Sequence, residues 1–313
     1  MTETALVTGG AGFIGSHLVD RLVGEGFRVA VVDNLSSGKR SNLHPGAEFH
    51  ERDIRDRAVR DLVKEVAPSL VFHLAAQISV SVSARDPILD AEINVLGSLN
   101  VLEGVRQVRG AKFVFVSTGG AIYGEPEEMP VPETTPCATA SPYGTSKLAV
   151  EEYLGTYQRA YGLDYAVVRL GNIYGPRQDP HGEAGVIAIF SRAMLANDTV
   201  TIFGDGEDER DYVFVEDTVD GIVKAAASRS PGPYNIGTGI GTSVNQLTRI
   251  LWDLTGYRKE PVHAPPRPGD IHKIYLDAAR ARRELGWTPR VGLEEGLRRT
   301  VTFFSSEQSH NDK

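Results

Sequence analysis

The sequence has almost no cysteine, no apolar run of membrane-spanning length and no excess of basic residues. Its one cysteine, Cys137, cannot form an internal disulfide, which fits a reducing compartment. The formal net charge of −8, without any Lys/Arg-rich run, argues against a general affinity for nucleic acid. The first strand is expected almost at Met1, which leaves no room for a signal peptide. We therefore expect a cytoplasmic protein without membrane or nucleic-acid partners.

The overall composition is that of an ordinary globular protein. Charged residues make up 24% and apolar residues 41% of the 313 residues. A chain of this length can bury a large core and suits one long domain or two closely packed ones. No set of metal ligands stands out.

The clearest motif lies in the first fifteen residues. The apolar run Ala5-Leu6-Val7 predicts a buried strand, and apolar residues at helical spacing follow from Phe13 and Ile14 onward. Gly9, Gly12 and Gly15 therefore form the turn between the strand and the helix. Glycines permit a tight reversal there, and the helix N-terminus attracts a pyrophosphate.

An acidic residue follows at the distance that a dinucleotide requires. The strand Phe27–Asp33 ends about twenty residues after the turn, where the Asp33 carboxylate can accept hydrogen bonds from the adenosine ribose. Asp33 would repel a 2′-phosphate, which favours NAD over NADP. The polar loop 34–40, with Asn34, Ser36 and Gly38, is expected to fold around the adenosine end.

Strands alternate with helices through the first half of the chain. Such alternation requires parallel pairing with right-handed crossovers, so the fold class is α/β, a doubly wound Rossmann sheet. The strands are expected near 5–7, 27–33, 48–53, 69–74, 112–117 and 165–170, with long helices at 87–108 and 143–161. The carboxyl ends of the strands share one edge, where ligands bind. At this edge lie Asp53, Ile54, Leu74, Ala75, Ala76, Gln77, Ser117 and Thr118.

The pattern loosens beyond residue 171. We expect an NAD-binding domain at 1–171 with a return segment near 216–236, and a smaller, discontinuous substrate-binding lobe at 172–313. Residues 305–313 are expected to form a frayed polar tail.

A tyrosine and a lysine four residues apart supply the candidate chemistry. Ser141 is the expected N-cap of a helix with Pro142 in its first turn, so Tyr143 and Lys147 project from the same face. A nearby ammonium and a positive nicotinamide favour the phenolate of Tyr143. This pair suits removal of a hydroxyl proton while hydride leaves the same carbon for NAD.

Residues 3–304 resemble the extended short-chain dehydrogenase/reductases, and within them the nucleotide-sugar epimerases typified by UDP-glucose (UDP-galactose) 4-epimerase. The motifs that carry the resemblance are Thr8–Gly15, Asp53-Ile54, His73–Ala76, Asn94, Ile122–Gly124, Ser141–Lys147, Gly204–Gly206, Arg210–Tyr212 and Arg267–Asp270. The resemblance implies hydride removal from C4 of a UDP-hexose and hydride return through a 4-keto sugar, in a homodimer paired through the helices 87–108 and 143–161.

The resemblance also implies roles for individual residues. Tyr143 is the base, and Lys147 is its partner and a ligand of the nicotinamide ribose. Asn94 joins the residues around the cofactor. The implied nucleotide-binding residues are Asn172, Val186, Thr201, Phe203, Arg210, Arg267 and Asp270. Paired arginines suit a diphosphate because their planar forks bind it bidentately.

The sequence departs from its relatives at two places. The third position of the usual Ser-rich run is Gly119, so either Thr118 or Ser117 assists the tyrosine, and Thr118 is favoured. A pocket-limiting aromatic falls at Ile274 or Tyr275. UDP-N-acetylglucosamine and UDP-glucuronate therefore stay open as substrates, with Arg177 or Arg192 facing a carboxylate. A 4,6-dehydratase or decarboxylase is the less favoured alternative, because Gly119 and Gly120 replace the acidic residues of those enzymes.

Overall fold

The computed structural model describes residues 2–181, 185–266 and 271–311. Its centre is a seven-stranded sheet with the order β11-β6-β5-β4-β1-β2-β3, in which every neighbouring pair is parallel. The strands are β1 (Thr4–Thr8), β2 (Arg28–Asp33), β3 (Glu48–Glu51), β4 (Leu70–His73), β5 (Lys112–Thr118), β6 (Asp164–Leu170) and β11 (Tyr234–Ile236). The predicted doubly wound fold is therefore confirmed.

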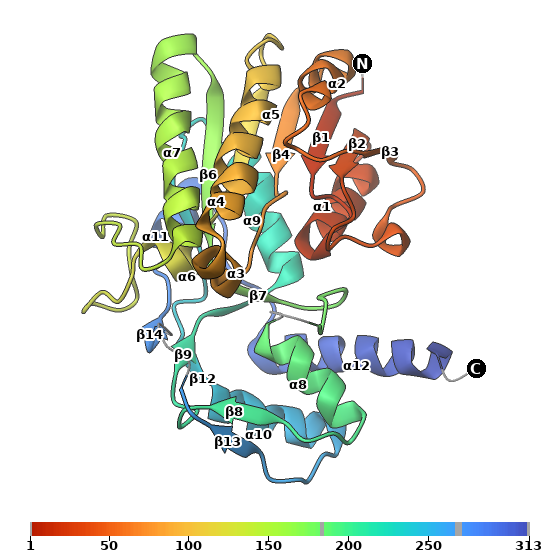
Figure 1. The fold of residues 1–313 in the computed structure, drawn as a ribbon, viewed down its shortest axis with the longest axis vertical. Helices are drawn as coiled ribbons and strands as arrows, with labels where there is room; N and C mark the ends of the chain where they lie inside the picture. The colour runs from red at the N-terminus through yellow and green to blue at the C-terminus, as the bar shows by residue number, and fades with distance from the viewer. Residues whose placement is uncertain (1, 182–184, 267–270, 312–313) are drawn as a thin grey trace.

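Helices cover both faces of this sheet because both faces of its strands are apolar (Figure 1). Alternate residues of β1 point to opposite sides: Val7 packs with α1 and α9, whereas Leu6 packs with α2, α5 and α7. The helices of the sheet are α1 (Phe13–Gly24), α2 (Ala58–Val66), α5 (Ser98–Val105), α6 (Gly119–Ile122), α7 (Pro142–Tyr161), α9 (Val215–Ala227) and α11 (Ala279–Leu285).

The long helix predicted at 87–108 is present as one continuous helical stretch from Pro87 to Val105, although its middle is π-helical and it ends three residues early. The structure has α3 (Val80–Arg85), then α4 (Pro87–Ala91), a π-helical segment (Glu92–Gly97) and α5, which ends at Val105. Asp86 caps α4, and Pro87 occupies its first turn, which separates α4 from α3. The periodicity of the apolar residues could not reveal the π-helical segment, which inserts an extra residue in the turn.

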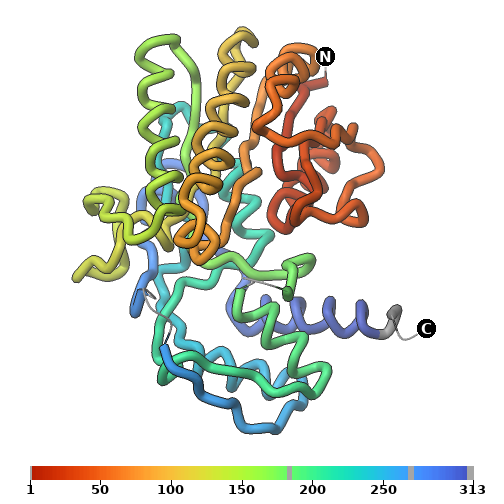
Figure 2. The backbone as a smooth tube through the Cα atoms, in the orientation of Figure 1, coloured from red at the N-terminus to blue at the C-terminus, as the bar shows by residue number. Residues whose placement is uncertain are grey.

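The second lobe lies beyond the carboxyl edge of the sheet, and the chain enters and leaves it more than once (Figure 2). Its strand pairs are β7 (Asn172–Tyr174) with β10 (Tyr212–Phe214), β8 (Thr201–Phe203) with β13 (Val262–Ala264), and β9 (Glu209–Arg210) with β12 (Thr242–Ser243) and β14 (Lys273–Ile274). Its helices are α8 (Val186–Leu195), α10 (Val244–Thr255) and α12 (Leu293–Asn311).

The expected polar tail at 305–313 is wrong as far as residue 311, because α12 continues to Asn311. Leu297, Val301 and Phe304 are buried on one face of this helix, where it packs on α8 and α10. Residues 312 and 313 lie outside the described part of the chain. None of the helices in the described ranges combines the length and apolar character needed to cross a membrane.

Candidate active site

The glycine turn between β1 and α1 forms a cradle that side chains would fill. Gly9 has φ +72°, and a Cβ atom there would lie 2.7 Å from the backbone nitrogen of Ala75. A Cβ atom on Gly15 would collide with the carbonyl oxygen of Gly9. Gly12 is the N-cap of α1, and no side chain caps this helix. The turn therefore presents backbone N–H groups to an anion, which fits the pyrophosphate of a dinucleotide.

Asp33 ends β2 beside this turn and is buried. Its Oδ2 accepts a hydrogen bond from the Ala11 backbone at 3.0 Å, and its Oδ1 accepts one from Leu35 at 2.8 Å. Gly38 approaches so closely that a Cβ atom there would lie 2.9 Å from Asp33 Oδ1. The loop after β2 thus folds back over the glycine turn, with the Asp33 carboxylate between them.

The other expected adenosine contacts form a connected group. The Asn34 side chain donates to Asp53 at 3.0 Å, and the backbone N–H of Ser36 donates to Asn34 at 3.1 Å. Hydrogen bonds from Arg55 lower the pKa of Asp53 to about 2, so this carboxylate is an anion at neutral pH. Ile54 is buried beneath the group.

The end of β4 lies against the same turn. The backbone N–H of Ala75 donates to the Thr8 hydroxyl at 3.3 Å. Gln77 and Asn94 hold each other reciprocally: the Gln77 N–H donates to Asn94 Oδ1 at 2.8 Å, and Asn94 Nδ2 donates to the Gln77 carbonyl at 2.9 Å. The remaining expected cofactor contacts at this edge are half-buried, namely Phe13, Ile14, Leu74 and Ala76.

Tyr143 and Thr118 meet at the carboxyl end of β5. Ser141 caps α7 by accepting from the Gly144 N–H at 3.2 Å, and Pro142 occupies the first turn, as predicted. The Thr118 hydroxyl lies close enough to the Tyr143 phenol to favour its ionised form as a donor. Lys147 is buried one turn further along α7, where its Nζ donates to the Val116 carbonyl at 2.9 Å.

Burial opposes the charged forms of both groups. It raises the pKa of Tyr143 to about 12, although the hydrogen bond from Thr118 favours the phenolate. It also lowers the pKa of Lys147 to about 8. In this structure, therefore, the expected lowering of the Tyr143 pKa by Lys147 does not outweigh desolvation. Further positive charge at the site is needed to favour the phenolate.

Ser117 does not face Tyr143. Its hydroxyl donates to Glu151 at 2.6 Å, and Arg169 holds the same carboxylate at 2.6 Å. A side chain at position 119 would not face Tyr143 either, because a Cβ atom on Gly119 would collide with the Leu276 side chain. Of the candidates considered from the sequence, Thr118 is the one that the structure brings to the tyrosine.

The expected substrate residues lie on the second lobe and at its junction with the sheet. Asn172 begins β7, and its Oδ1 would lie 3.6 Å from a Cβ atom on Gly120, beside Thr118. The Arg210 guanidinium donates to the Glu209 carbonyl at 3.0 Å and is half-buried. Three residues lie further into the lobe, namely Val186 at the start of α8, and Thr201 and Phe203 on β8. Arg267 and Asp270 lie outside the described residues.

Comparison with known proteins supports these assignments of fold and cofactor. Residues 5–237 match the family described as the NAD dependent epimerase/dehydratase family. The chain belongs to this family. A protein of Mycolicibacterium smegmatis named UDP-glucose 4-epimerase is 48% identical over 308 residues, which cover 96% of this chain and 98% of the relative.

Two solved epimerase structures match nearly the whole chain. The UDP-glucose 4-epimerase of Thermotoga maritima, solved with UDP-glucose, has a TM-score of 0.96 and 52% identity, covering 97% of this chain and 99% of that one. The UDP-glucose 4-epimerase of Thermus thermophilus, solved in complex with NAD, has a TM-score of 0.91 and 47% identity, covering 96% and 98%.

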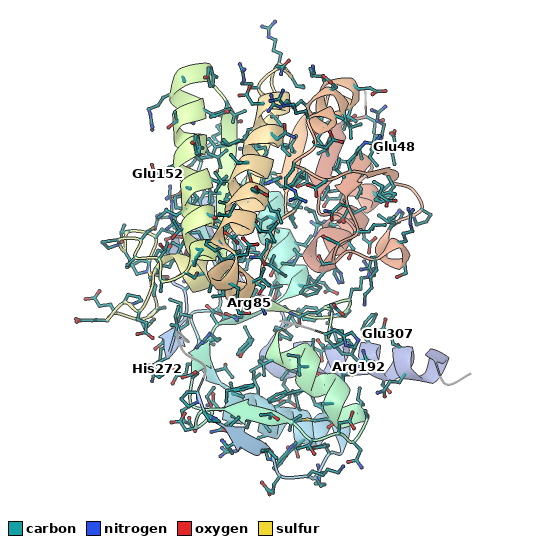
Figure 3. The ribbon with its side chains drawn as sticks, in the orientation of Figure 1. Glu48, Arg85, Glu152, Arg192, His272 and Glu307 are labelled. Carbon is teal, nitrogen blue, oxygen red and sulfur yellow. The ribbon has the colours of Figure 1, made fainter. Side chains whose placement is uncertain are left out.

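The sequence of this epimerase/dehydratase family member suggests Arg177 or Arg192 as a partner for a sugar carboxylate, and Ile274 or Tyr275 as the residue that limits the pocket. Arg177 pairs with Asp20 at 2.7 Å, and Arg192, labelled in Figure 3 on α8, contacts His181. Ile274 is buried with Ile122 and Leu276, whereas the ring of the half-buried Tyr275 lies 2.8 Å from where a Gly241 Cβ atom would be. Ile274 is therefore the residue of the two that lies in the core.

Sequence reasoning missed the buried polar groups that support the site. Asp211 accepts hydrogen bonds from Thr238, Gly239 and Leu276, and so ties together three separate segments behind Arg210. Asp90, Glu151 and Arg169 are equally well bonded. The sequence offered one indication of each, a polar residue in an otherwise apolar segment, but this does not show which residues it would bond to.

Proposed function

We propose that this protein is an NAD-dependent 4-epimerase that interconverts UDP-glucose and UDP-galactose. The observation that carries the proposal is the contact between Tyr143 and Thr118 beside the buried Lys147. These residues lie at the same sheet edge as the glycine turn and Asp33. The similarity to UDP-glucose 4-epimerases over nearly the full chain supports this choice within the family.

The chain's own residues move the proton and hold the ligands. Tyr143 accepts the proton of the sugar 4-hydroxyl, and Thr118 orients the phenol through their hydrogen bond. Lys147 places an ammonium group at the site, which favours the phenolate. NAD, held by the glycine turn and Asp33, would supply the hydride acceptor for C4 and the hydride donor for the opposite face of the sugar. Tyr143 then gives the proton back, so the cycle leaves the cofactor unchanged.

The cofactor is held by the glycine turn and by the group around Asp33. Gly9, Gly12 and Gly15 give the backbone N–H groups access to the pyrophosphate, and the Asp33 carboxylate accepts from the adenosine ribose. A carboxylate at this place repels a 2′-phosphate, so NAD is selected over NADP.

The nucleotide half of the substrate binds to the second lobe. Asn172 and Arg210 contact the diphosphate together with Arg267, while Val186, Thr201 and Phe203 surround the uridine. Tight binding of the nucleotide leaves the sugar free to turn over, which return of hydride to the other face requires. Asp270, which lies outside the described residues, is the last member of this set that the resemblance implies.

A 4,6-dehydratase or decarboxylase activity is disfavoured at Gly119. Those enzymes need an acid/base pair or a carboxylate after the Ser/Thr position. A Cβ atom on Gly119 would collide with the Leu276 side chain. Glycine at positions 119 and 120 therefore supplies no acid for elimination at the place where those enzymes carry one.

The protein is proposed to act as a cytoplasmic homodimer. Large apolar side chains are exposed along the outer surface of α4, the π-helical segment and α7: Ile88 is 72%, Leu96 59% and Tyr153 42% exposed. Pairing of these helices with those of a second copy would cover this surface.

The test is to incubate the purified protein, without added NAD, with UDP-glucose, UDP-N-acetylglucosamine or UDP-glucuronate and to follow each sugar by NMR. The expected result is UDP-galactose from UDP-glucose, with no net NADH, and no product with Tyr143→Phe. A 4-keto-6-deoxy sugar, a pentose or stoichiometric NADH would contradict the proposal, and epimerisation of only another sugar would reassign the substrate.

A further inference from the structure

Asp90 is a fully buried carboxylate to which the proposed reaction gives no role. It lies on α4, and its side chain is 0% exposed. Its Oδ1 accepts from Gln77 Nε2 at 2.8 Å and from Asn94 Nδ2 at 2.9 Å, while its Oδ2 accepts from the Ser146 hydroxyl at 2.6 Å. All three donors are neutral, so within the described chain no cation bonds directly to this carboxylate. An ionised carboxylate buried in this way requires a counter-charge nearby.

Lys147 has the complementary requirement. Its ammonium is buried, donates to the neutral carbonyl of Val116, and lies 4.9 Å from the centroid of the Phe115 ring. The carbonyl and the aromatic ring solvate the charge but do not neutralise it. A carboxylate within electrostatic reach must therefore compensate for the desolvation of Lys147.

The charged and titratable groups around Lys147 identify which carboxylate this is. Asp90 acts on it from α4, Glu151 from its own helix, and His73 from β4. Burial lowers the pKa of His73 to about 3, so this ring is neutral. Glu151 is paired with Arg169 through hydrogen bonds at 2.6 and 3.1 Å, and the two charges cancel. Asp90 is the remaining anion.

The hydrogen bonds of Asp90 also connect it to both halves of the site. Gln77 and Asn94 are expected cofactor contacts at the ends of β4 and of the π-helical segment, and Ser146 directly precedes Lys147 on α7. We propose that Asp90 is a positioning residue: its carboxylate is the counter-charge of Lys147 and joins α4, the end of β4 and α7 around the nicotinamide end of the site. The role of Asp90 in turnover rests on the proposed function, whereas its electrostatic effect on Lys147 does not.

The same charge acts on the base. Asp90 disfavours the phenolate of Tyr143 while it favours the ammonium of Lys147. Burial is the main reason why the pKa of Tyr143 is raised, and the Asp90 carboxylate adds to it, while the same carboxylate opposes the lowering of the Lys147 pKa by burial. Neither effect requires Asp90 to touch the substrate.

The test measures the ionisation of Lys147 directly. The protein is labelled with 13Cε-lysine. The NMR signal of Lys147 is identified as the one that is missing from Lys147→Arg, and the chemical shift of this signal is followed against pH without substrate. Asp90→Asn keeps the shape of the side chain and removes its charge, and the Lys147 pKa should fall by at least about one unit. Asp86→Asn removes a charge from the exposed cap of the same helix and should leave it unchanged.

A second control separates charge from scaffold. Ser146→Ala removes one hydrogen bond of Asp90 but keeps the carboxylate, so the Lys147 titration should stay near that of the parent. An unchanged titration in Asp90→Asn, or an equal shift in Ser146→Ala or Asp86→Asn, would overturn the proposal. If Asp90→Asn does not fold, Asp90→Ser removes the same charge with a smaller side chain and must meet the same expectation.

Turnover supplies the second readout. In Asp90→Asn the alkaline limb of kcat should move to lower pH with little change in the KM for UDP-glucose, because Asp90 does not contact the substrate. A uniform loss of kcat at all pH values would contradict the counter-charge role. The titration requires no turnover, so failure of the epimerase proposal and failure of the Asp90 proposal give different results.

Discussion

Thr118 and Ser117 are neighbours at the end of β5, yet the structure gives their hydroxyl groups different partners. Thr118 is placed to donate to Tyr143, and Ser117 donates to Glu151. Their alanine variants should therefore separate catalysis from stability. Both substitutions remove one hydroxyl from the same strand end, and Thr118→Ala also removes a methyl group, so Thr118→Ser is the control that restores the hydroxyl alone.

The magnitudes follow from what each hydroxyl contacts. Thr118→Ala removes a hydrogen bond to the proposed base, and kcat should fall about 10²-fold, or about 2.7 kcal/mol in the activation free energy. Ser117→Ala removes one donor from a buried carboxylate that keeps its pairing with Arg169. Its free energy of unfolding should fall by about 2 kcal/mol, the contribution of a hydrogen bond to a charged group.

The assay combines initial rates of UDP-galactose conversion with guanidinium unfolding of the same preparations. Ser117→Ala should keep kcat within about threefold of the parent, because its contact is with the support of the site. Thr118→Ser restores the hydroxyl and should recover most of the rate. The reasoning is refuted if Ser117→Ala loses the rate at unchanged stability, or if Thr118→Ala turns over normally.

Three further sets of variants test the structure elsewhere. Because the pKa of buried His73 is about 3 and its unfolded value is 6.5, only the unfolded chain binds a proton between these values. The free energy of unfolding should thus fall below pH 6.5, by up to about 1.4 kcal/mol per pH unit, and His73→Gln should flatten this fall in guanidinium titrations. Gly119→Ala should cost about 1–3 kcal/mol of stability through overpacking, whereas Gly120→Ala should fold normally and lower kcat/KM. Arg169→Met should cost about 3–5 kcal/mol by leaving Glu151 buried and unpaired, and adding Glu151→Gln should recover part of this loss in denaturant unfolding.

The parallel sheet was predictable because its strands are buried on both faces. Except for the edge strand β3, most of them contain a short, continuous apolar run, such as 113–116, and the glycine turn fixes the place of the first. The second lobe has weaker signals: β7, β9 and β14 are two or three residues long, and their side chains are partly exposed. A periodicity argument needs longer segments, so the sequence did not indicate these strands.

The candidate site was predictable where one strand end or one helix turn carried the residues. Tyr143 and Lys147 share a helix face, and Thr118 follows from the end of its strand. The choice between Thr118 and Ser117 depends on the direction of each side chain after β5, which no spacing rule gives. The hydrogen bonds of the buried carboxylates join separate segments of the chain, as between Asp90 and Ser146, which are 56 residues apart, and only the folded chain brings them together.

The electrostatics of the site link base strength to occupancy. In the structure the Tyr143 phenol is held neutral by burial and by Asp90, while Lys147, with a pKa of about 8, carries its charge at neutral pH. The protein alone therefore provides one cation opposed by one anion, which leaves little net field to ionise the tyrosine. A positively charged cofactor ring at the carboxyl end of the sheet would lower the proton affinity of Tyr143 and favour the phenolate, whereas a ring that has lost its charge would not. The proton affinity of Tyr143 would then be high while the proton has to be held and low when it has to be returned, so the same groups would serve both directions of the reaction.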